Sequence, residues 1–251
     1  MGWLFVKRRM MTELGNDWQN KFKGFDKQSC SAASLGQVHK AISVDGKSLA
    51  CKLQYPDMQS AIEADLKQLK LAFNLYERAD KAISTKSIHK ELSARLAEEL
   101  DYKREASNLK LYSAILKSEK NVFVPDVIDN LSTDRLLTMT WLEGNKLLDW
   151  LEREPDLNSR NNVAVNMFKA WYIPFYFYGV IHGDPHLGNY SITDKEKINL
   201  LDFGSIRFFN PTFVEGVITL YKALKTNNSK LAEEAYYCLL YTSDAADEPM
   251  R

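Results

Sequence analysis

The chain has 251 residues, enough for one large domain or a two-lobed unit with a sizeable core. Its 33 basic and 33 acidic residues cancel, and hydrophobic residues make up 45% of the chain, which is ordinary for a globular protein. This balance gives no electrostatic reason to expect a nucleic-acid partner. The longest apolar stretch, residues 167–181, carries a lysine, a proline and a glycine. It is too short and too interrupted to predict a transmembrane segment.

The first half of the chain predicts a hairpin followed by two long helices. Two short β-prone runs, residues 35–43 and 47–54, flank the turn Val44-Asp45-Gly46. Residues 58–80 carry apolar side chains at steps of three and four, as an amphipathic helix requires. A second long helix is predicted over residues 87–117.

The rest of the chain mixes short strands with longer helices. Residues 122–128 and 136–141 predict two strands with a polar turn, residues 129–134, between them. The later predictions, in chain order, are a helix over 147–153, a helix over 161–178, a loop over 182–189, a β-pair over 190–193 and 198–201, and helical sequence from 211 to about 240. Because strands concentrate in the first half and helices in the second, we expect a small β-containing lobe joined near residue 143 to a mainly helical lobe.

Two motifs near the end carry the strongest chemical signal, H-G-D-P-H-L-G-N at residues 182–189 and L-L-D-F-G at residues 200–204. Phosphoryl transfer from ATP needs a carboxylate near the attacking oxygen and hard oxygen ligands for magnesium beside the phosphates. We therefore predict Asp184 as the catalytic carboxylate, with Asn189 and Asp202 as ligands of Mg²⁺. The ordered pair of motifs is much harder to obtain by chance than D-F-G alone.

An upstream lysine, Lys52, lies in the second strand of the predicted hairpin, where protein kinases carry their nucleotide lysine. In that role it binds the α- and β-phosphates and needs a helix carboxylate to hold it in place. Spacing alone does not rank the acidic residues of the following helix, which are Glu91, Glu98, Glu99, Asp101 and Glu105. The small-residue stretch 31–37 occupies the place of a Gly-rich phosphate loop, yet Gly36 is its only glycine.

The ordered motifs resemble those of the UbiB family of atypical kinases, also called the coenzyme Q kinase-like or AarF family. The matching segments, spread over about residues 29–207, are S-A-A-S-L-G-Q-V-H (31–39), C-K-L-Q-Y-P (51–56), E-L-D-Y-K-R-E-A-S-N (99–108) and the two motifs above. The resemblance implies an α+β, two-lobed protein-kinase-like fold. Its N-lobe, with extra helices, would span residues 1–143 and its mainly helical C-lobe residues 144–240. Residues 241–251 do not continue the helical pattern and are expected to be a non-native or disordered tail.

The resemblance also assigns roles to individual residues. It implies that Glu105 is the helix partner of Lys52, and that Glu99 and Asp101 are the E-x-D pair of the family's active site. The alanine-rich loop would cover the phosphates with Ala32, Ala33, Ser34, Leu35, Gly36 and Gln37. The hinge over residues 139–143 would contact the adenine through Met139, Trp141 and Leu142.

The function implied by the resemblance is that of an ATP-dependent atypical kinase or ATPase that uses ATP and Mg²⁺. It would support the biosynthesis of ubiquinone, an isoprenoid quinone. Expected partners besides the nucleotide are quinone intermediates, anionic membrane lipids or quinone-biosynthesis proteins. The expected location is cytoplasmic, with peripheral attachment at the inner membrane. The family's K-x-G-Q motif has no match in residues 1–29, and few residues follow the D-F-G motif, so we expect a fragment truncated at both ends.

Two other functions stay open at this point. H-G-D-x-H-x-G-N also resembles the loop of aminoglycoside and choline kinases, which keeps a phosphotransferase acting on a small molecule or protein among the alternatives. A non-catalytic nucleotide-binding scaffold is the third. The alanine-rich loop and the E-x-D pair favour the ATPase over the phosphotransferase. The presence of Lys52, Asp184, Asn189 and Asp202 favours it over the scaffold.

Overall fold

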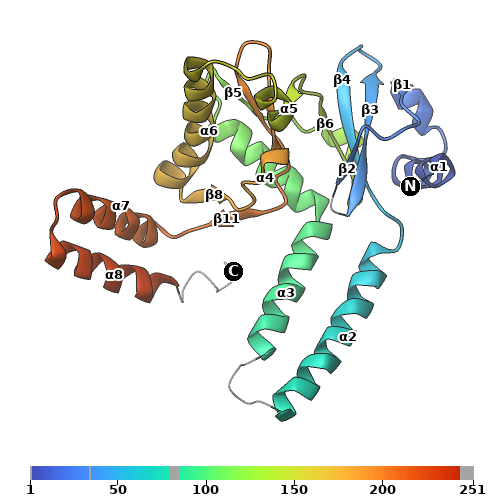
Figure 1. The fold of residues 1–251 in the computed structure, drawn as a ribbon. Coiled ribbons are helices and arrows are strands. Elements are labelled where there is room, and N and C mark those ends of the chain that lie inside the picture. Colours follow the sequence, from blue (N-terminus) through green and yellow to red (C-terminus); the bar gives the residue numbers. More distant parts are fainter. Residues whose placement is uncertain (1, 34, 80–84, 244–251) are drawn as a thin grey trace. The chain divides into compact units, whose positions relative to one another are not determined.

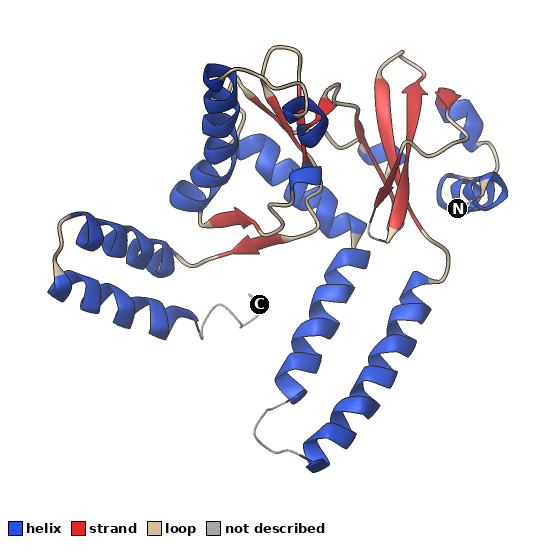
Figure 2. Cartoon of the chain, viewed as in Figure 1, coloured by secondary structure: helices blue, strands red, loops and turns tan. Residues whose placement is uncertain are grey.

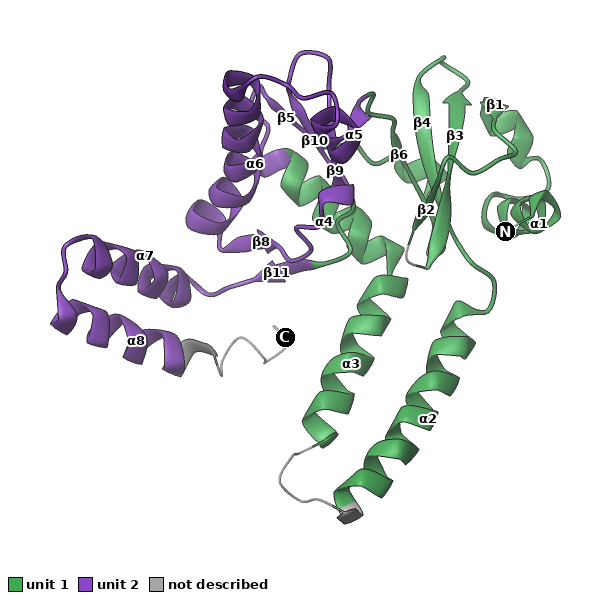
Figure 3. Cartoon of the chain, in the orientation of Figure 1, with its two compact units in different colours: residues 1–113, 125–143, 202–205 green, residues 114–124, 144–201, 206–251 purple. Residues whose placement is uncertain are grey.

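The computed structural model of the chain describes residues 2–33, 35–79 and 85–243 (Figure 1). The chain divides into two compact units that interleave in sequence (Figure 3). Unit 1 contains residues 1–113, 125–143 and 202–205, and unit 2 contains residues 114–124, 144–201 and 206–251. The short D-F-G segment therefore belongs to unit 1, although the residues on either side of it belong to unit 2.

Unit 1 is built on a five-stranded antiparallel sheet with the path β1-β3-β4-β6, in which β2 also pairs with β3 (Figure 2). Its strands are β1 (Phe22–Phe25), β2 (Ser31–Ala33), β3 (Gly36–Ser43), β4 (Ser48–Gln54) and β6 (Leu136–Thr140). The predicted hairpin is confirmed as β3 and β4, which pair in register from Gly36 opposite Gln54 to Ile42 opposite Ser48. This pairing places β4 between β3 and β6 in the sheet.

The helices of unit 1 include an N-terminal helix that the sequence patterns did not predict. They are α1 (Trp3–Leu14), the short η1 (Trp18–Lys21), α2 (Met58–Ala79), α3 (Thr85–Leu100), most of α4 (Tyr102–Ile115) and the short η2 (Asp129–Leu131). Val6 and Met10 of α1 are fully buried one helical turn apart. They join Trp18, Leu49 and Leu53 in a hydrophobic core that fixes this helix to the sheet.

The prediction of one helix over residues 87–117 is wrong, because the helix breaks at Asp101. Its carboxylate oxygen Oδ1 accepts a hydrogen bond of 2.9 Å from the backbone N–H of Arg104. This side-chain cap satisfies a free backbone donor at the start of a new helix, α4. The preceding helix, α3, packs instead against α2, and the two form a long helical hairpin (Figure 1).

Unit 2 contains more β-structure than the sequence patterns predicted. A four-stranded sheet has the order β5-β10-β9-β7, and β8 pairs with β11. The strands are β5 (Val122–Phe123), β7 (Asn145–Lys146), β8 (Val180–His182), β9 (Tyr190–Ile192), β10 (Ile198–Leu200) and β11 (Ile206–Phe208). The helices are α5 (Leu147–Leu151), α6 (Leu157–Tyr178), the short η3 (Leu187–Asn189), α7 (Pro211–Lys225) and α8 (Ser229–Ser243).

The strand predicted over residues 122–128 is divided: only Val122 and Phe123 form β5, whereas Val127 makes an antiparallel bridge with Met139 of β6. β5 pairs in parallel with β10, whereas β6 pairs with β4 in the other unit. Pro125 lacks a backbone donor and cannot continue β5 as a ladder strand. The first run therefore divides near Pro125, and its second part runs beside β6, where the backbone N–H of Ile128 donates a 2.8 Å hydrogen bond to the carbonyl oxygen of Thr138.

The catalytic-loop motif is positioned by the end of α6. This helix ends at Gly179, whose φ of +66° is the left-handed conformation typical of glycine after a helix. A Cβ at this position would also lie 2.5 Å from the carbonyl oxygen of Phe209. The chain then turns directly into β8, and the motif follows.

At the C-terminal end, α8 extends beyond the predicted helical limit near residue 240. It ends at Ser243, so the predicted tail over 241–251 begins inside this helix, and residues 244–251 lie outside the described part. Within the described part of the chain, no helix combines the length and apolar character needed to cross a membrane.

Candidate functional site

Lys52 is the centre of the candidate site in unit 1. It lies in β4 opposite Val38 of β3 and Leu137 of β6, and only 7% of its surface is exposed. Its ammonium Nζ lies 2.7 and 2.9 Å from the two carboxylate oxygens of Glu105. The same nitrogen lies 3.2 Å from Oδ2 of Asp202. The structure thus brings together three of the predicted site residues.

The electrostatics of this cluster favour a charged lysine. Burial alone would lower the pKa of Lys52, but the negative charges of Glu105 and Asp202 outweigh burial and raise the pKa above its ordinary value. Burial also raises the pKa of Glu105, against the attraction of the same ammonium. The raised pKa of Lys52 favours its charged form, whereas the raised pKa of Glu105 favours the neutral acid. We take the charged pair as the form present, because the ammonium binds both oxygens of Glu105 and also contacts a second carboxylate.

Glu105 belongs to one buried face of α4 that also holds the D-F-G segment. Asn108 is 5% exposed, and its Nδ2 donates a 2.9 Å hydrogen bond to the carbonyl oxygen of Phe203. The ring of Tyr112 lies 5.3 Å from the Phe203 ring, measured between centroids. Asn108 and Tyr112 were not among the predicted site residues, although steps of three and four along one helix are the signal that groups them with Glu105.

Asp202 has a backbone conformation that is uncommon for a residue other than glycine. Its φ is +59°, in the left-handed region, which aspartate tolerates better than most side chains. Its Oδ1 accepts a 3.1 Å hydrogen bond from the backbone N–H of Gly204. This local turn orients the carboxylate so that Oδ2 contacts Lys52.

The alanine-rich loop forms a tight hairpin between β2 and β3. Ala33 pairs with Gly36 and Ala32 pairs with Gln37, while Leu35 lies in the turn and is half-buried. Ser34, also predicted to bind nucleotide, lies outside the described residues.

The side chain of Gln37 does not join the Lys52 cluster. Its Nε2 donates a 2.7 Å hydrogen bond to Nε2 of His39, and Nδ1 of His39 donates to the carbonyl oxygen of Asp26 at 2.8 Å. Side chains alternate along a strand, so Gln37 and His39 share one face of β3. Val38, opposite Lys52 in the ladder, belongs to the other face.

The E-x-D residues lie at the junction of α3 and α4. Glu99 is half-buried in the last turn of α3, and the exposed Asp101 caps α4. The ion pairs of Lys52 within the described chain are made with Glu105 and Asp202, not with this pair. The junction is fixed to the sheet by Gln54, whose buried Nε2 donates a 3.1 Å hydrogen bond to the carbonyl oxygen of Leu100.

The predicted hinge residues continue the edge of the unit 1 sheet. Met139 pairs with Ala50 of β4, and the backbone N–H of Trp141 donates a 2.9 Å hydrogen bond to the carbonyl oxygen of Ser48. The Nζ of Lys40 lies 4.5 Å from the centroid of the Trp141 ring. Met139, Trp141 and the following Leu142 are all half-buried.

In unit 2 the structure brings Asp184 and Asn189 together. Nδ2 of Asn189 donates to Oδ2 of Asp184 at 2.9 Å and to its carbonyl oxygen at 3.1 Å. Nδ1 of His186 accepts a 3.0 Å hydrogen bond from the backbone N–H of Gly188, which braces the loop. The backbone N–H of Leu201 donates to the carbonyl oxygen of Asn189 at 2.8 Å. These bonds tie the loop to the end of β10.

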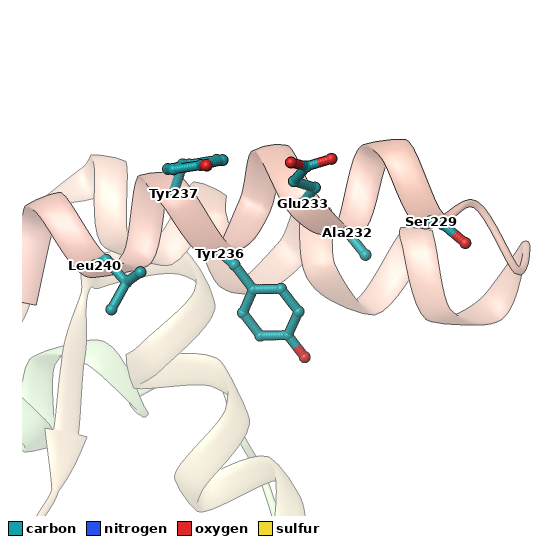
Figure 4. A pocket seen from close by; sticks show the side chains of 6 residues that line it. All are labelled: Ser229, Ala232, Glu233, Tyr236, Tyr237 and Leu240. Atoms are coloured by element: carbon teal, nitrogen blue, oxygen red, sulfur yellow. The ribbon is translucent and has the colours of Figure 1, made fainter.

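A surface hollow runs along α8, but it involves none of the predicted site residues. Its lining consists of Ser229, Ala232, Glu233, Tyr236, Tyr237 and Leu240 (Figure 4). All six side chains project from the same helix in Figure 4. The hollow is therefore the outer surface of one helix rather than a site built from several elements.

The comparisons with known proteins agree with these motifs. A model of the ABC1 atypical kinase-like domain matches residues 1–236. The chain is 30% identical over 230 residues to the mitochondrial atypical kinase coq-8 of Caenorhabditis elegans, covering 90% of this chain and 30% of that protein. It is 31% identical over 222 residues to the mitochondrial atypical kinase COQ8 of Saccharomyces cerevisiae, covering 88% of this chain and 43% of that protein. The chain thus spans less than half the length of these curated relatives.

A solved structure is similar in fold. The Rv3197–erythromycin complex from Mycobacterium tuberculosis superposes with a TM-score of 0.80 at 26% sequence identity, covering 94% of this chain and 59% of that chain. The resemblance drawn from the motifs is therefore confirmed, as is a mixed α/β kinase-like fold with a β-sheet N-terminal region. The chain belongs to the family of ABC1 atypical kinase-like domains.

Proposed function

We propose that this chain is an ATP-dependent atypical kinase or ATPase that binds Mg-ATP and supports ubiquinone biosynthesis. The observation that carries the proposal is the buried ion pair of Lys52 with Glu105, with Asp202 beside it. Such a pair is the part of a kinase site that holds the lysine ready for the α- and β-phosphates. The relatives named as coq-8 and COQ8 atypical kinases support the link to quinone biosynthesis.

In this proposal the nucleotide lies against the face of β3 and β4 that carries Lys52. The alanine-rich loop, residues 32–37, covers the phosphates with its backbone, since small side chains permit close approach. The hinge segment, residues 139–142, contacts the adenine. The Glu99 and Asp101 pair lies where α4 begins and tunes the use of nucleotide and metal.

The proposed ligands of Mg²⁺ are Asn189 and Asp202. Nδ2 of Asn189 donates to Asp184, which leaves its amide oxygen as the atom that could coordinate a metal. Both proposed donors are hard oxygens, which suit Mg²⁺, and Mg²⁺ usually takes only one or two protein ligands beside phosphates and water. Accordingly, the described residues include no group of three or more His, Cys, Asp or Glu side chains that could hold a metal by themselves. The ion would neutralise charge on the β- and γ-phosphates.

Asp184 is the proposed catalytic carboxylate, accepting the proton of a water or hydroxyl group that attacks the γ-phosphate. The Lys52 cluster belongs to unit 1 and the Asp184 loop to unit 2. The proposed location is peripheral, at the inner membrane, with quinone intermediates, anionic lipids or quinone-biosynthesis proteins as partners.

Nucleotide binding is tested first, by thermal unfolding with ATP in the presence and absence of Mg²⁺. A ligand at 100 times its Kd stabilises a protein by about 2.7 kcal/mol, so a clear rise in the unfolding temperature is expected for the wild-type chain. Asp202→Ala should abolish the Mg²⁺-dependent part of this rise. Asp194→Ala, which removes an exposed carboxylate from the turn after β9, should leave it intact. A Mg²⁺-dependent rise that survives Asp202→Ala would remove the metal assignment.

Turnover is tested by phosphate release with and without quinone-headgroup analogues and anionic liposomes. Asp184→Asn should lower the rate by about 10²–10⁴-fold while ATP still binds, because an amide cannot accept the proton. Phosphate release without an acceptor, lost in this variant, supports the ATPase. Phosphate appearing only on an added sugar, lipid or protein would favour the phosphotransferase. Binding without any turnover would favour the scaffold.

A further inference from the structure

Tyr102, the first residue of α4, lies beside Lys52 with a buried and unpaired hydroxyl group. Only 2% of its surface is exposed. Its ring centroid lies 5.4 Å from Nζ of Lys52, within the range of a cation–π interaction. The hydroxyl oxygen is fully buried and has no hydrogen-bond partner among the described residues. Because a buried polar group without a partner is unfavourable, this hydroxyl calls for a physical explanation.

The sheet register places this hydroxyl on the same face as Lys52. Val38 lies opposite Lys52 in the antiparallel ladder, and Gly36 lies opposite Gln54. Directly opposed residues share a face, and so do residues two apart on one strand, which puts Gly36 and Lys52 on one side of the sheet. A Cβ atom at Gly36 would lie 2.8 Å from the hydroxyl oxygen of Tyr102. The hydroxyl therefore lies against the first residue of β3, where the alanine-rich loop ends.

We propose that the Tyr102 hydroxyl donates a hydrogen bond to a phosphate oxygen of the bound nucleotide, which makes Tyr102 a further binding residue beside Lys52. This inference rests on the proposed nucleotide function. The hydroxyl is unpaired, lies at the end of the loop proposed to cover the phosphates, and shares a sheet face with the proposed phosphate-binding lysine.

Two further features of the site suit this role. Burial raises the pKa of Tyr102 above its ordinary value, so the phenol is neutral and can donate a proton near neutral pH. Glu105, three residues further along the same helix, already has both carboxylate oxygens bound to Lys52. The hydroxyl proton is thus left for a ligand acceptor.

The test is Tyr102→Phe, which removes the hydroxyl and keeps the ring beside Lys52. Isothermal titration calorimetry of Mg-ATP and of adenosine measures the two affinities. Loss of a hydrogen bond to a charged phosphate should weaken ATP binding about tenfold or more. Adenosine has no phosphate, and its affinity should not change. The unfolding temperature without nucleotide should stay the same or rise, because no hydrogen bond within the protein is lost.

The control is Tyr172→Phe, which removes the hydroxyl of a tyrosine in the aromatic cluster of α6 and should change neither affinity. Unchanged ATP affinity in Tyr102→Phe would overturn the inference. A lower unfolding temperature without nucleotide, with the ATP and adenosine affinities reduced equally, would also overturn it, since the hydroxyl would then have a structural role. If the wild-type chain binds no Mg-ATP, the proposed function itself fails, and that outcome is distinguishable from a failure confined to Tyr102.

Discussion

Lys52 is held by two carboxylates that come from distant parts of the chain, Glu105 and Asp202. They lie 53 and 150 residues further along the sequence. A buried ion pair gains little over a well-packed apolar pair, because both charges must leave water. Removing only one member is much worse, since it leaves the other charge buried and uncompensated. The cluster is therefore better understood as a means of positioning Lys52 than as a source of stability.

Substitutions within the buried ion pair should therefore have non-additive effects on stability. Lys52→Met should lower the free energy of unfolding by about 3–5 kcal/mol, because Glu105 and Asp202 lose their shared cation. The double variant Lys52→Met, Glu105→Leu should lose less than the sum of the two single changes. Urea denaturation of the four proteins measures the coupling.

The matched control is the exposed pair of Lys40 and Glu143, in which the lysine side chain is 34% exposed and the carboxylate 75% exposed. Lys40→Met should change stability by only about 0–1 kcal/mol. Equal losses at the two lysines, or strict additivity at the buried pair, would contradict the assignment.

At the scale of elements, the β2–β3 hairpin depends on a glycine for close approach. A Cβ at Gly36 would lie 2.3 Å from the carbonyl oxygen of Leu53, which is backbone of the neighbouring strand β4. Neither strand can move without disturbing the ladder that contains Lys52. The requirement for glycine here is steric, because Gly36 does not have a positive φ.

Gly36→Ala should therefore destabilise unit 1 by about 1–3 kcal/mol, the usual range for overpacking a tight site, and should weaken nucleotide binding. Gly24→Ala is the matched control. It makes the same change in the same sheet, where the new methyl group would meet only the side chain of Ile42 at 3.9–4.0 Å. Thermal unfolding and ATP titration of both variants separate the two sites. Equal stability of the two variants would contradict the steric explanation.

The break between α3 and α4 gives Asp101 a structural role beside the one that the family resemblance implies. Asp101→Ala should lower stability by about 1 kcal/mol through loss of the helix cap. Asp101→Asn should keep the cap, because asparagine also accepts from the backbone. A change in ATP binding or turnover in Asp101→Asn, at unchanged stability, would support the E-x-D role. Wild-type nucleotide behaviour in that variant would leave Asp101 as a cap alone.

A second cap serves as control for Asp101. Asp156 caps α6 by accepting a 2.8 Å hydrogen bond from the backbone N–H of Ser159. Asp156→Ala should show a similar loss of stability in thermal unfolding and no change in ATP affinity. A loss of ATP affinity in this variant would indicate that weaker helix capping alone disturbs the site.

At the scale of the whole molecule, the proposed machinery is divided between two units. Unit 1 contains Lys52, Glu105 and Asp202, and unit 2 contains Asp184 and Asn189. The chain crosses between the units directly before Asp202, since Leu201 belongs to unit 2 and its N–H is bonded to Asn189. The D-F-G segment is thus retained in unit 1 by the buried face of α4, through Asn108.

Sequence patterns predicted some elements well and others poorly. The β3–β4 hairpin and α2 agree with the predictions nearly to the residue. The single helix over 87–117 failed because one side-chain cap, at Asp101, outweighs continuous helical periodicity. The strand predicted over residues 122–128 is divided, because its first two residues pair with β10, far along the chain, while Val127 bridges Met139 of β6.

The ordered motifs in the sequence were enough to indicate the family. They also singled out Lys52, Asp184, Asn189 and Asp202 as the residues with the required side-chain chemistry. The sequence did not decide by spacing which of five acidic residues meets the lysine. The family resemblance implied Glu105, and the tertiary structure shows how it meets Lys52: the break at Asp101 starts a new helix whose buried face carries Glu105 to the lysine. The unpaired hydroxyl of Tyr102 on that same face was equally invisible in the sequence, because hydrogen-bond satisfaction depends on three-dimensional neighbours.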